Sequence, residues 1–163
     1  MISVLVIYAS LAISTPRVVR LFRQSAAIVE RDTGIRLKPS FVRRRNIPRA
    51  PYGREVKMLR DFEGYFSNDS RRSVLIVPPA LVPVTLQESK SGQAIVCSGR
   101  AVLSVFSNTR LERFNLHTLT HEIGHMLGAT HSDDLSVMLP VSTSGLYFNS
   151  GSVEEIRECV GGL

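Results

Sequence analysis

The stretch H-E-I-G-H-M-L-G-A-T-H at residues 121–131 limits the folds open to this 163-residue chain more than any other part of the sequence. His121 and His125 are four residues apart, so on a helix both side chains project from one face and their imidazoles converge. Gly128 allows the chain to leave that helix in a sharp turn, because glycine adopts backbone conformations closed to other residues. His131 then returns toward the first two histidines. The stretch therefore predicts a helix, a tight turn and a three-histidine metal site.

A metal held by three neutral imidazoles keeps an open coordination position, which is the arrangement of catalytic zinc, and one Zn²⁺ is the expected cofactor. Glu122 lies about 100° round the helix from His121. That is too far for a natural third ligand, but it is within reach of a water on the metal. Glu122 is therefore the predicted general base, which takes a proton from the attacking water and delivers it to the leaving amine. The predicted reaction is hydrolysis of peptide bonds without a covalent intermediate.

Together with a later methionine, the stretch resembles the signature of the metzincin clan of zinc metallopeptidases, H-E-x-x-H-x-x-G-x-x-H followed by a Met-turn. Met138 stands seven residues after His131, and the resemblance implies that it forms an apolar floor beneath the imidazoles. Asn115-Leu116 and Asp134 look like the matrixin branch, in which Asp134 would tie the loop to the Met-turn by hydrogen bonds. The spacing from His131 to Met138 is one residue shorter than in matrixins, so no named subfamily is assigned.

The resemblance also implies how a substrate binds. The strand before the active-site helix, here Gln93–Cys97, would pair along the cleft rim with an extended peptide by strand addition. Residues 140–147 would form the wall of the pocket for the side chain after the scissile bond, where Tyr147 either packs or hydrogen-bonds to the transition state. His117 lies one helical turn before His121 and about 6 Å further along the axis. It is expected to be a core or cleft histidine and not a fourth ligand.

The first forty residues predict a strand, a helix and a second strand. Residues 2–8 are a short, β-branched apolar run, typical of a buried strand. Thr15 offers an N-cap and Pro16 a first helical residue, and apolar positions recur at helical spacing until Gly34. A second strand follows at residues 35–42. This order predicts two parallel strands joined by a right-handed crossover.

Patterning and turn residues predict the elements of the remaining chain. They are a helix over residues 54–66, a strand over 73–77, a hairpin of 93–97 with 101–106, a helix over 116–127 capped by Asn115, and a last helix from the Ser152–Glu155 capping box to Gly161. The predicted fold is α+β, a metzincin-like single domain over residues 1–163. Its twisted mixed sheet has about five strands, one of them an antiparallel edge strand, beside the active-site helix and the C-terminal helix.

The two cysteines, Cys97 and Cys159, do not form a C-x-x-C pair, so a thiolate zinc site is not indicated. Two separate buried thiols are expected in a reducing compartment, and one disulfide after export. The resemblance implies the disulfide, because a bridge of the adamalysin branch is similarly placed. Localisation, cytoplasmic or secreted, stays open, since the apolar start lacks the basic region of a signal peptide. That apolar start is also too short for a transmembrane segment.

The net charge of +6 and arginine clusters such as Arg43–Arg45 predict either a solvated basic face or a surface for nucleic acid or anionic membranes. A polypeptide substrate is the favoured partner, and the oligomeric state stays open. The alternative function is a basic nucleic-acid- or membrane-associated binding protein with a structural or regulatory zinc site, but such a site has no use for Glu122. An exopeptidase would need a group that holds a chain terminus, and none is recognisable.

Overall fold

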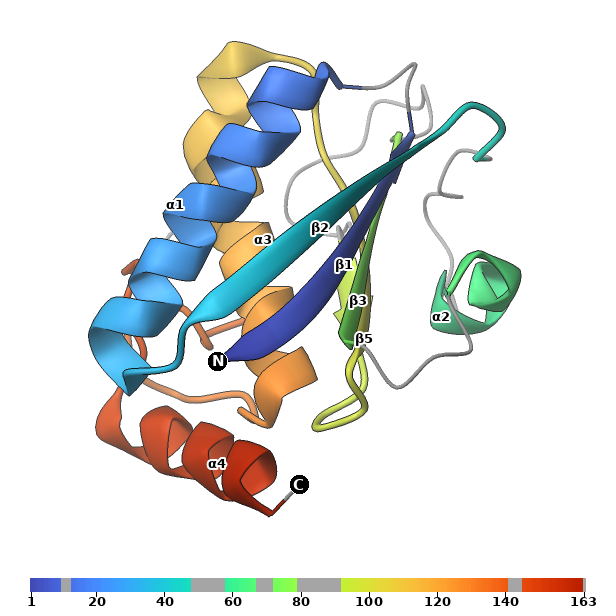
Figure 1. Ribbon diagram of the computed structural model, residues 1–163. Helices are drawn as coiled ribbons and strands as arrows, with labels where there is room; N and C mark the ends of the chain where they lie inside the picture. Colours follow the sequence, from blue (N-terminus) through green and yellow to red (C-terminus); the bar gives the residue numbers. More distant parts are fainter. Residues whose placement is uncertain (10–12, 48–57, 67–71, 79–91, 141–144, 163) are drawn as a thin grey trace.

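The computed structural model describes residues 1–9, 13–47, 58–66, 72–78, 92–140 and 145–162 (Figure 1). They form a mixed α/β fold around one five-stranded sheet, as predicted. The sheet order is β2-β1-β3-β5-β4, and the strands are β1 (Ile2–Ala9), β2 (Leu37–Arg44), β3 (Arg72–Val77), β4 (Gly92–Ala94) and β5 (Arg100–Ser104). β2, β1, β3 and β5 run parallel, and β4 at one edge is antiparallel to β5.

The predicted strand–helix–strand unit at the start of the chain is confirmed. Helix α1 (Thr15–Thr33) connects the parallel strands β1 and β2. The N-cap of α1 is Ser14 and not Thr15. The hydroxyl of Thr15 instead lies 2.8 Å from the Tyr8 hydroxyl. Gly34 ends the helix with a φ of 77°, a left-handed conformation that favours glycine. Only the cap prediction was wrong, by a single residue.

The predicted hairpin is present, but its first strand is shorter than expected. β4 pairs with β5 through Gly92, Gln93 and Ala94 and then stops. It does not reach Cys97, because Cys97 has a φ of 58° and Gly99 a φ of 75°, so the chain is already turning there. β4 is thus a short edge strand that lies beside the helix of His121 and His125.

The helix predicted over residues 54–66 is only partly visible, because residues 54–57 lie outside the described residues. The described part holds one helical turn, α2 (Met58–Asp61), and a 3₁₀ turn, η1 (Glu63–Tyr65). Phe62 and Phe66 are buried, as predicted, in a small apolar cluster with Leu75 and Val102. This cluster covers the face of the sheet opposite α1.

The predicted active-site helix, α3 (Glu112–Leu127), starts earlier than its sequence signal. It follows a 3₁₀ turn, η2 (Thr109–Leu111), whose cap is Asn108. Asn115 therefore lies inside the helix, and the prediction that it caps α3 was wrong. Its buried amide instead donates to the Phe106 carbonyl and accepts from the Phe106 N–H, both at 3.0 Å. These two bonds join the helix to the end of β5.

The final helix, α4 (Ser150–Gly161), also begins before its predicted start. Its N-cap is Asn149, whose side-chain oxygen accepts from the Ser152 N–H at 2.7 Å. The predicted capping box is therefore wrong. Glu155 instead accepts bonds from the N–H and the hydroxyl of Thr130, both at 2.7 Å. α4 is thus connected to the segment that carries the third histidine.

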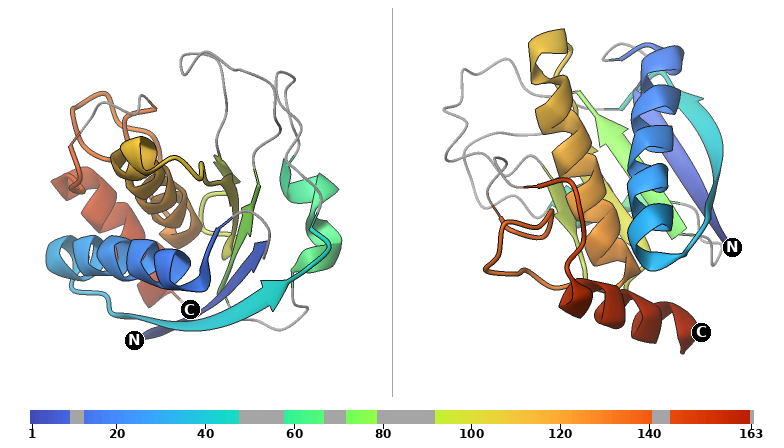
Figure 2. Two further views of the ribbon diagram at one scale, coloured as in Figure 1. Left: turned by 90° about the horizontal axis from the view of Figure 1, so that it is seen from above. Right: turned by 90° about the vertical axis from the view of Figure 1, so that its left-hand side faces the viewer.

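The layers place α3 in the middle of the molecule. α1 and α3 lie side by side on one face of the sheet, α2 lies on the other face, and α4 crosses near the end of α3 (Figures 1 and 2). The main core forms between the sheet and the helices α1 and α3, and its buried side chains include Phe22, Leu103, Leu119 and Ile123. Among the described residues no helix has the length and apolar content needed to cross a membrane.

Candidate metal centre

The three histidines predicted as ligands come together at the end of α3. Each of His121, His125 and His131 offers one ring nitrogen, and these nitrogens all lie within 4.8 Å of one another. The first two come from α3, and His131 comes from the loop after it. His121 and His125 are almost fully buried, whereas His131 is exposed. The cluster thus combines two buried histidines of a helix with one exposed histidine of a loop.

Backbone carbonyls orient the two helical imidazoles. Nδ1 of His121 lies 2.8 Å from the Val137 carbonyl oxygen, and Nδ1 of His125 lies 2.7 Å from that of Ala129. A carbonyl oxygen only accepts, so each Nδ1 carries the proton and each Nε2 carries a lone pair. This is the tautomer in which a histidine binds metal through Nε2.

The two Nε2 atoms face each other 3.0 Å apart. Two lone pairs at that distance repel unless a cation lies between them. In a tetrahedral zinc site with bonds of ~2.0–2.1 Å, ligand nitrogens are about 3.3 Å apart. The spacing and the donor type of His121 and His125 therefore fit a zinc ion.

Burial keeps these imidazoles in the neutral form that a metal needs. It lowers the pKa of His121 to about 4, and it outweighs the opposing effect of the hydrogen bond to Val137. The pKa of His125 is also lowered, chiefly by burial. Neutral rings at physiological pH can bind a cation without first losing a proton.

Gly128 has the role predicted for it. It ends α3 with a φ of 123°, where a side chain is strained. A Cβ atom built there would lie 2.5 Å from Cβ of Cys159 and 2.9 Å from the carbonyl oxygen of Glu155. Gly128 therefore allows both the turn toward His131 and the close packing of α4 against the end of α3.

Met138 packs against the histidine-bearing helix at Gly124, and its role as an apolar floor beneath the imidazoles stays a prediction. It is fully buried, and a Cβ atom at Gly124 would lie 2.5 Å from its sulfur. The turn that carries Met138 also supplies the Val137 carbonyl to His121. Phe148 lies at the same place, 2.8 Å from that Gly124 Cβ position.

Asp134 ties the loop to this turn, as the resemblance implied. Its carboxylate accepts from the Ser132 hydroxyl and the Ser136 N–H, each at 2.9 Å, and from the Asn149 amide at 2.8 Å. Hydrogen bonds from Ser136 and Asn149 hold the pKa of Asp134 below its usual range. The charge of one exposed carboxylate therefore organises the chain between His131 and Met138.

Glu122 is 5% exposed, and its Oε2 has no hydrogen-bond partner within the described part of the chain. Burial raises the pKa of this carboxyl to about 8. A buried carboxylate without a partner is costly unless a positive charge or a proton compensates it. Such strong perturbation is a frequent property of groups that transfer protons.

His117 does not join the ligand cluster. It is buried and lies one turn back along α3, with its ring centroid 6.1 Å from that of His121. Burial, together with the charge of Arg113, lowers its pKa. This agrees with the prediction of a core or cleft histidine.

Cys97 and Cys159 form a disulfide, with their Cα atoms 5.9 Å apart. It joins the β4–β5 turn to α4, and the Cys97 N–H donates to the His125 carbonyl at 2.9 Å. Of the two alternatives left open by the sequence, the structure has the bridge. The bridge spans the end of α3 next to the histidine cluster.

Sequence reasoning missed a contact between the end of α1 and the segment around Phe148. Asp32 accepts a 2.9 Å hydrogen bond from the Phe148 N–H, and Arg31 donates to the Leu146 carbonyl at 2.8 Å. Burial opposes ionisation of Asp32, but hydrogen bonds from Arg31 and Phe148 prevail and lower its pKa. No local pattern marks this contact, because 116 residues separate its partners.

The predicted substrate-binding elements are described in part. β4 is the edge strand expected beside α3, although it is shorter than Gln93–Cys97. Of the predicted pocket wall at residues 140–147, residues 141–144 lie outside the described residues. Tyr147 is 41% exposed, so it is not a core side chain.

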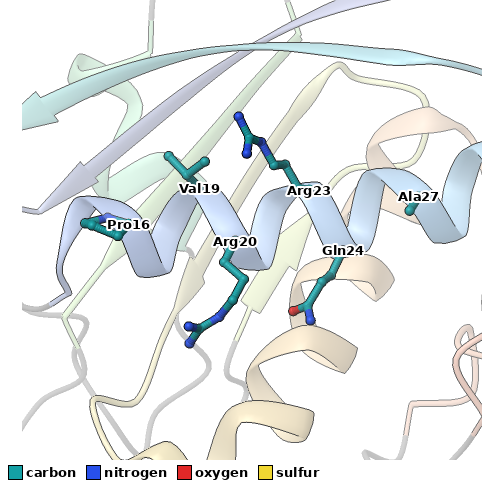
Figure 3. Close-up of a pocket in the computed structure, with 6 residues that line it drawn as sticks. All are labelled: Pro16, Val19, Arg20, Arg23, Gln24 and Ala27. Atoms are coloured by element: carbon teal, nitrogen blue, oxygen red, sulfur yellow. The ribbon is translucent and has the colours of Figure 1, made fainter.

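A hollow of about 470 Å³ lies on one face of α1, and none of the three histidines lines it (Figure 3). The six residues that line it come from successive turns of α1: Pro16, Val19, Arg20, Arg23, Gln24 and Ala27. Side chains of this kind supply neither an imidazole nor a carboxylate for a metal. The candidate site is therefore the histidine cluster at the end of α3.

Comparison with known proteins shows the fold. No protein-family model and no curated protein matches the sequence. The crystal structure of an archaemetzincin from Methanopyrus kandleri is similar, with a TM-score of 0.70 at 19% identity, over 98% of this chain and 96% of that one. A zinc-dependent peptidase from Methanocorpusculum labreanum has a TM-score of 0.57 at 16% identity, over 94% of this chain and 99% of that one.

Metalloproteinase-II from Bacteroides fragilis has a TM-score of 0.68 at 12% identity. The match covers 97% of this chain but 52% of the metalloproteinase, so this chain spans about half the length of that protein. At these identities the likeness is one of architecture. The chemistry has to be argued from the residues of the site.

Proposed function

We propose that this protein is a zinc-dependent metalloendopeptidase of the metzincin type, with one Zn²⁺ held by His121, His125 and His131. The observation that carries the proposal is the convergence of three imidazole nitrogens beside a buried carboxylate, Glu122. A structural zinc site does not need that carboxylate, whereas a hydrolytic site does. The fold supports the proposal, since the similar structures bear the names archaemetzincin, metalloproteinase and zinc-dependent peptidase.

The residues of the chain then have distinct tasks. When bound, zinc supplies a positive charge that polarises a substrate carbonyl and lowers the pKa of a water molecule. The carbonyls of Val137 and Ala129 hold the rings of His121 and His125 in the ligand tautomer. Glu122 accepts a proton from the attacking water on a carboxylate oxygen and transfers it to the leaving amine. Its Oε2 is free for this task, because no described donor occupies it.

An extended polypeptide is the substrate class that the edge of the sheet favours. β4 is the last strand of the sheet, and among the described residues no further strand pairs with its outer side. A peptide that adds to such an edge is bound through main-chain hydrogen bonds, which need no chain terminus. This recognition favours cleavage within a chain over removal of terminal residues.

The test is the substitution Glu122→Gln in zinc-loaded protein. The amide has the size of the carboxylate, and the substitution leaves all three histidines in place. The amide does not, however, accept the proton from the attacking water. Zinc content should stay near one ion per chain, while turnover of a peptide library read by mass spectrometry falls by about 10²- to 10⁴-fold. Glu154→Gln, in an exposed position of α4, is the matched control and should cleave like the parent.

Two results would contradict the proposal. A Glu122→Gln protein that retains zinc and cleaves at the parent rate would show that Glu122 is not the base. A parent protein that is inactive on all peptides, unaffected by chelators and bound to DNA with a steep salt dependence would favour the nucleic-acid-binding alternative.

A further inference from the structure

We propose that Gly92 is a positioning residue for Glu122: it lets the edge strand β4 lie directly against the carboxylate of the base. The inference rests on the proposed function for its catalytic consequence. The contact itself concerns two residues that are 30 positions apart in the sequence and meet where β4 packs beside α3.

The space at Gly92 is filled by Glu122. A Cβ atom built on Gly92 would lie 2.5 Å from Oε1, 2.6 Å from Cγ and 2.7 Å from Cδ of Glu122. Real Cβ atoms essentially never approach other atoms this closely. Any residue other than glycine therefore has to displace either the strand or the carboxylate.

Backbone conformation does not explain the glycine. The described glycines with positive φ are Gly34, Gly99 and Gly128, and Gly92 is not among them. A residue with a side chain is therefore compatible with the local backbone at position 92. Gly92 is the first residue of β4, and in strands glycine is normally unfavourable, since it gives up packing and conformational entropy. The requirement at this position is space for Glu122.

β4 is held on both of its faces and by its pairing with β5, so it has little freedom to move away from Glu122. Side chains alternate along β4, which puts Gly92 and Ala94 toward α3 and Gln93 toward the opposite face. Ala94 packs against the main core, and the Gln93 side chain accepts a bond from the Leu59 N–H of α2 at 3.3 Å. β4 also pairs with β5 along its length.

The carboxylate is the part that must move. The backbone of Glu122 is fixed, because the same turn of α3 carries two of the histidines, and its side chain alone can rotate. A methyl group at position 92 would push the carboxylate aside by about 1 Å, and a misplacement of that size can cost a reaction roughly 10²-fold. Gly92 thus couples the position of the proposed substrate-binding strand to the position of the base.

The contact can be tested by thermal unfolding of zinc-saturated protein. Gly92→Ala should lower Tm by at least about 2 °C in the parent, because it overpacks a buried contact. In a Glu122→Ala background the same substitution fills the vacated space, so Tm should stay level or rise. Gly151→Ala in α4 is the control, since its new Cβ would meet Asn149 Oδ1 at an ordinary 3.7 Å. Any change of Tm that it causes through helix propensity should be the same in both backgrounds, because it does not depend on Glu122.

Peptidase kinetics then test the catalytic consequence. Gly92→Ala should lower kcat by about 10²-fold with KM changed less than about threefold and with one zinc retained. A loss of substrate binding by the strand would raise KM instead. The control Gly151→Ala should leave both constants at parent values.

Each outcome decides a separate statement. An equal loss of Tm in both backgrounds would overturn the contact with Glu122 and assign the glycine to strand packing. If Gly92→Ala lowers Tm in the parent but not in the Glu122→Ala background, and kcat is unchanged, the contact holds but the positioning role is overturned. If the parent itself cleaves no peptide, the proposed function fails and with it the catalytic role of Gly92, while the Tm cycle still decides the contact.

Discussion

Removal of the Cys97–Cys159 disulfide should destabilise the protein strongly. The bridge closes a loop with a sequence separation of 62 residues, which contains all of α3, the histidine cluster and most of α4. In the chain-entropy description, a loop of this length contributes about 4.3 kcal/mol to stability at 25 °C, because it restricts the unfolded chain. Cys97 is itself exposed, so its own burial contributes little. The expected loss on opening the bridge is about 4 kcal/mol.

Urea unfolding of metal-free protein measures this loss. The free energy of unfolding is compared for oxidised protein, for protein reduced with a phosphine, and for the double variant Cys97→Ser/Cys159→Ser. Reduced and variant proteins should agree, and reductant should not change the variant, which is the control for side effects. The dependence on urea should steepen in both, because an open unfolded chain exposes more surface.

Two observations would refute this reasoning. Titration of two free thiols in freshly prepared native protein, with an intact mass that does not rise by about two daltons on reduction, would show that no bridge exists. A bridge that is present but whose reduction changes the free energy of unfolding by less than about 1 kcal/mol would show that chain entropy is not its main contribution.

Two further substitutions test the floor of the site and the loop beside it. Gly124→Ala should cost up to about 2 kcal/mol in urea unfolding, because overpacking of about 1–3 kcal/mol exceeds a helix-propensity gain of about 1 kcal/mol. Its Cβ would lie 2.5 Å from the sulfur of Met138 and 2.8 Å from the ring of Phe148. Added Met138→Ala should therefore reduce that cost but not abolish it, and a fully stable single variant would contradict the packing. Asp134→Asn should lower Tm at pH 7. Since the folded-state pKa of Asp134 is lowered, the difference in Tm from the parent should shrink progressively as pH falls below about 4, the pKa of an unfolded aspartate. A difference in Tm that is independent of pH would show that the charge is not what stabilises the loop.

Predictions that depended on neighbouring residues in the chain were the most accurate. The start of α1 within one residue of Pro16 and its end before Gly34 follow from a fixed φ and from a left-handed glycine, which are properties of single residues. Buried strands were found within one or two residues by their apolar content. Errors arose where a local signal had competitors: Asn149 caps α4 in place of Ser152, which frees Glu155 to bind Thr130.

In the candidate site, too, some features follow from neighbouring residues and others depend on segments far apart in the chain. The spacing of His121 and His125 and the glycine before His131 are local, so the ligand cluster was predictable. The carbonyl that orients His121 belongs to Val137, and its position depends on how the later turn folds back beneath α3. The sequence also left the pairing of Cys97 undecided, since a disulfide depends both on the redox state of the compartment and on where the chain brings the two cysteines.

Local sequence signals were therefore sufficient for the helix that presents two histidines and a glutamate, for the turn that leads to the third histidine, and for a mostly parallel sheet with one antiparallel edge. These follow from the periods of helix and strand and from the backbone preferences of glycine and proline. The hydrogen bond between Asp32 and Phe148 and the close approach of Gly92 to Glu122 have no such local signal. Such contacts join segments far apart in the chain, and they form only once the hydrophobic core has set the distances between the sheet and its helices.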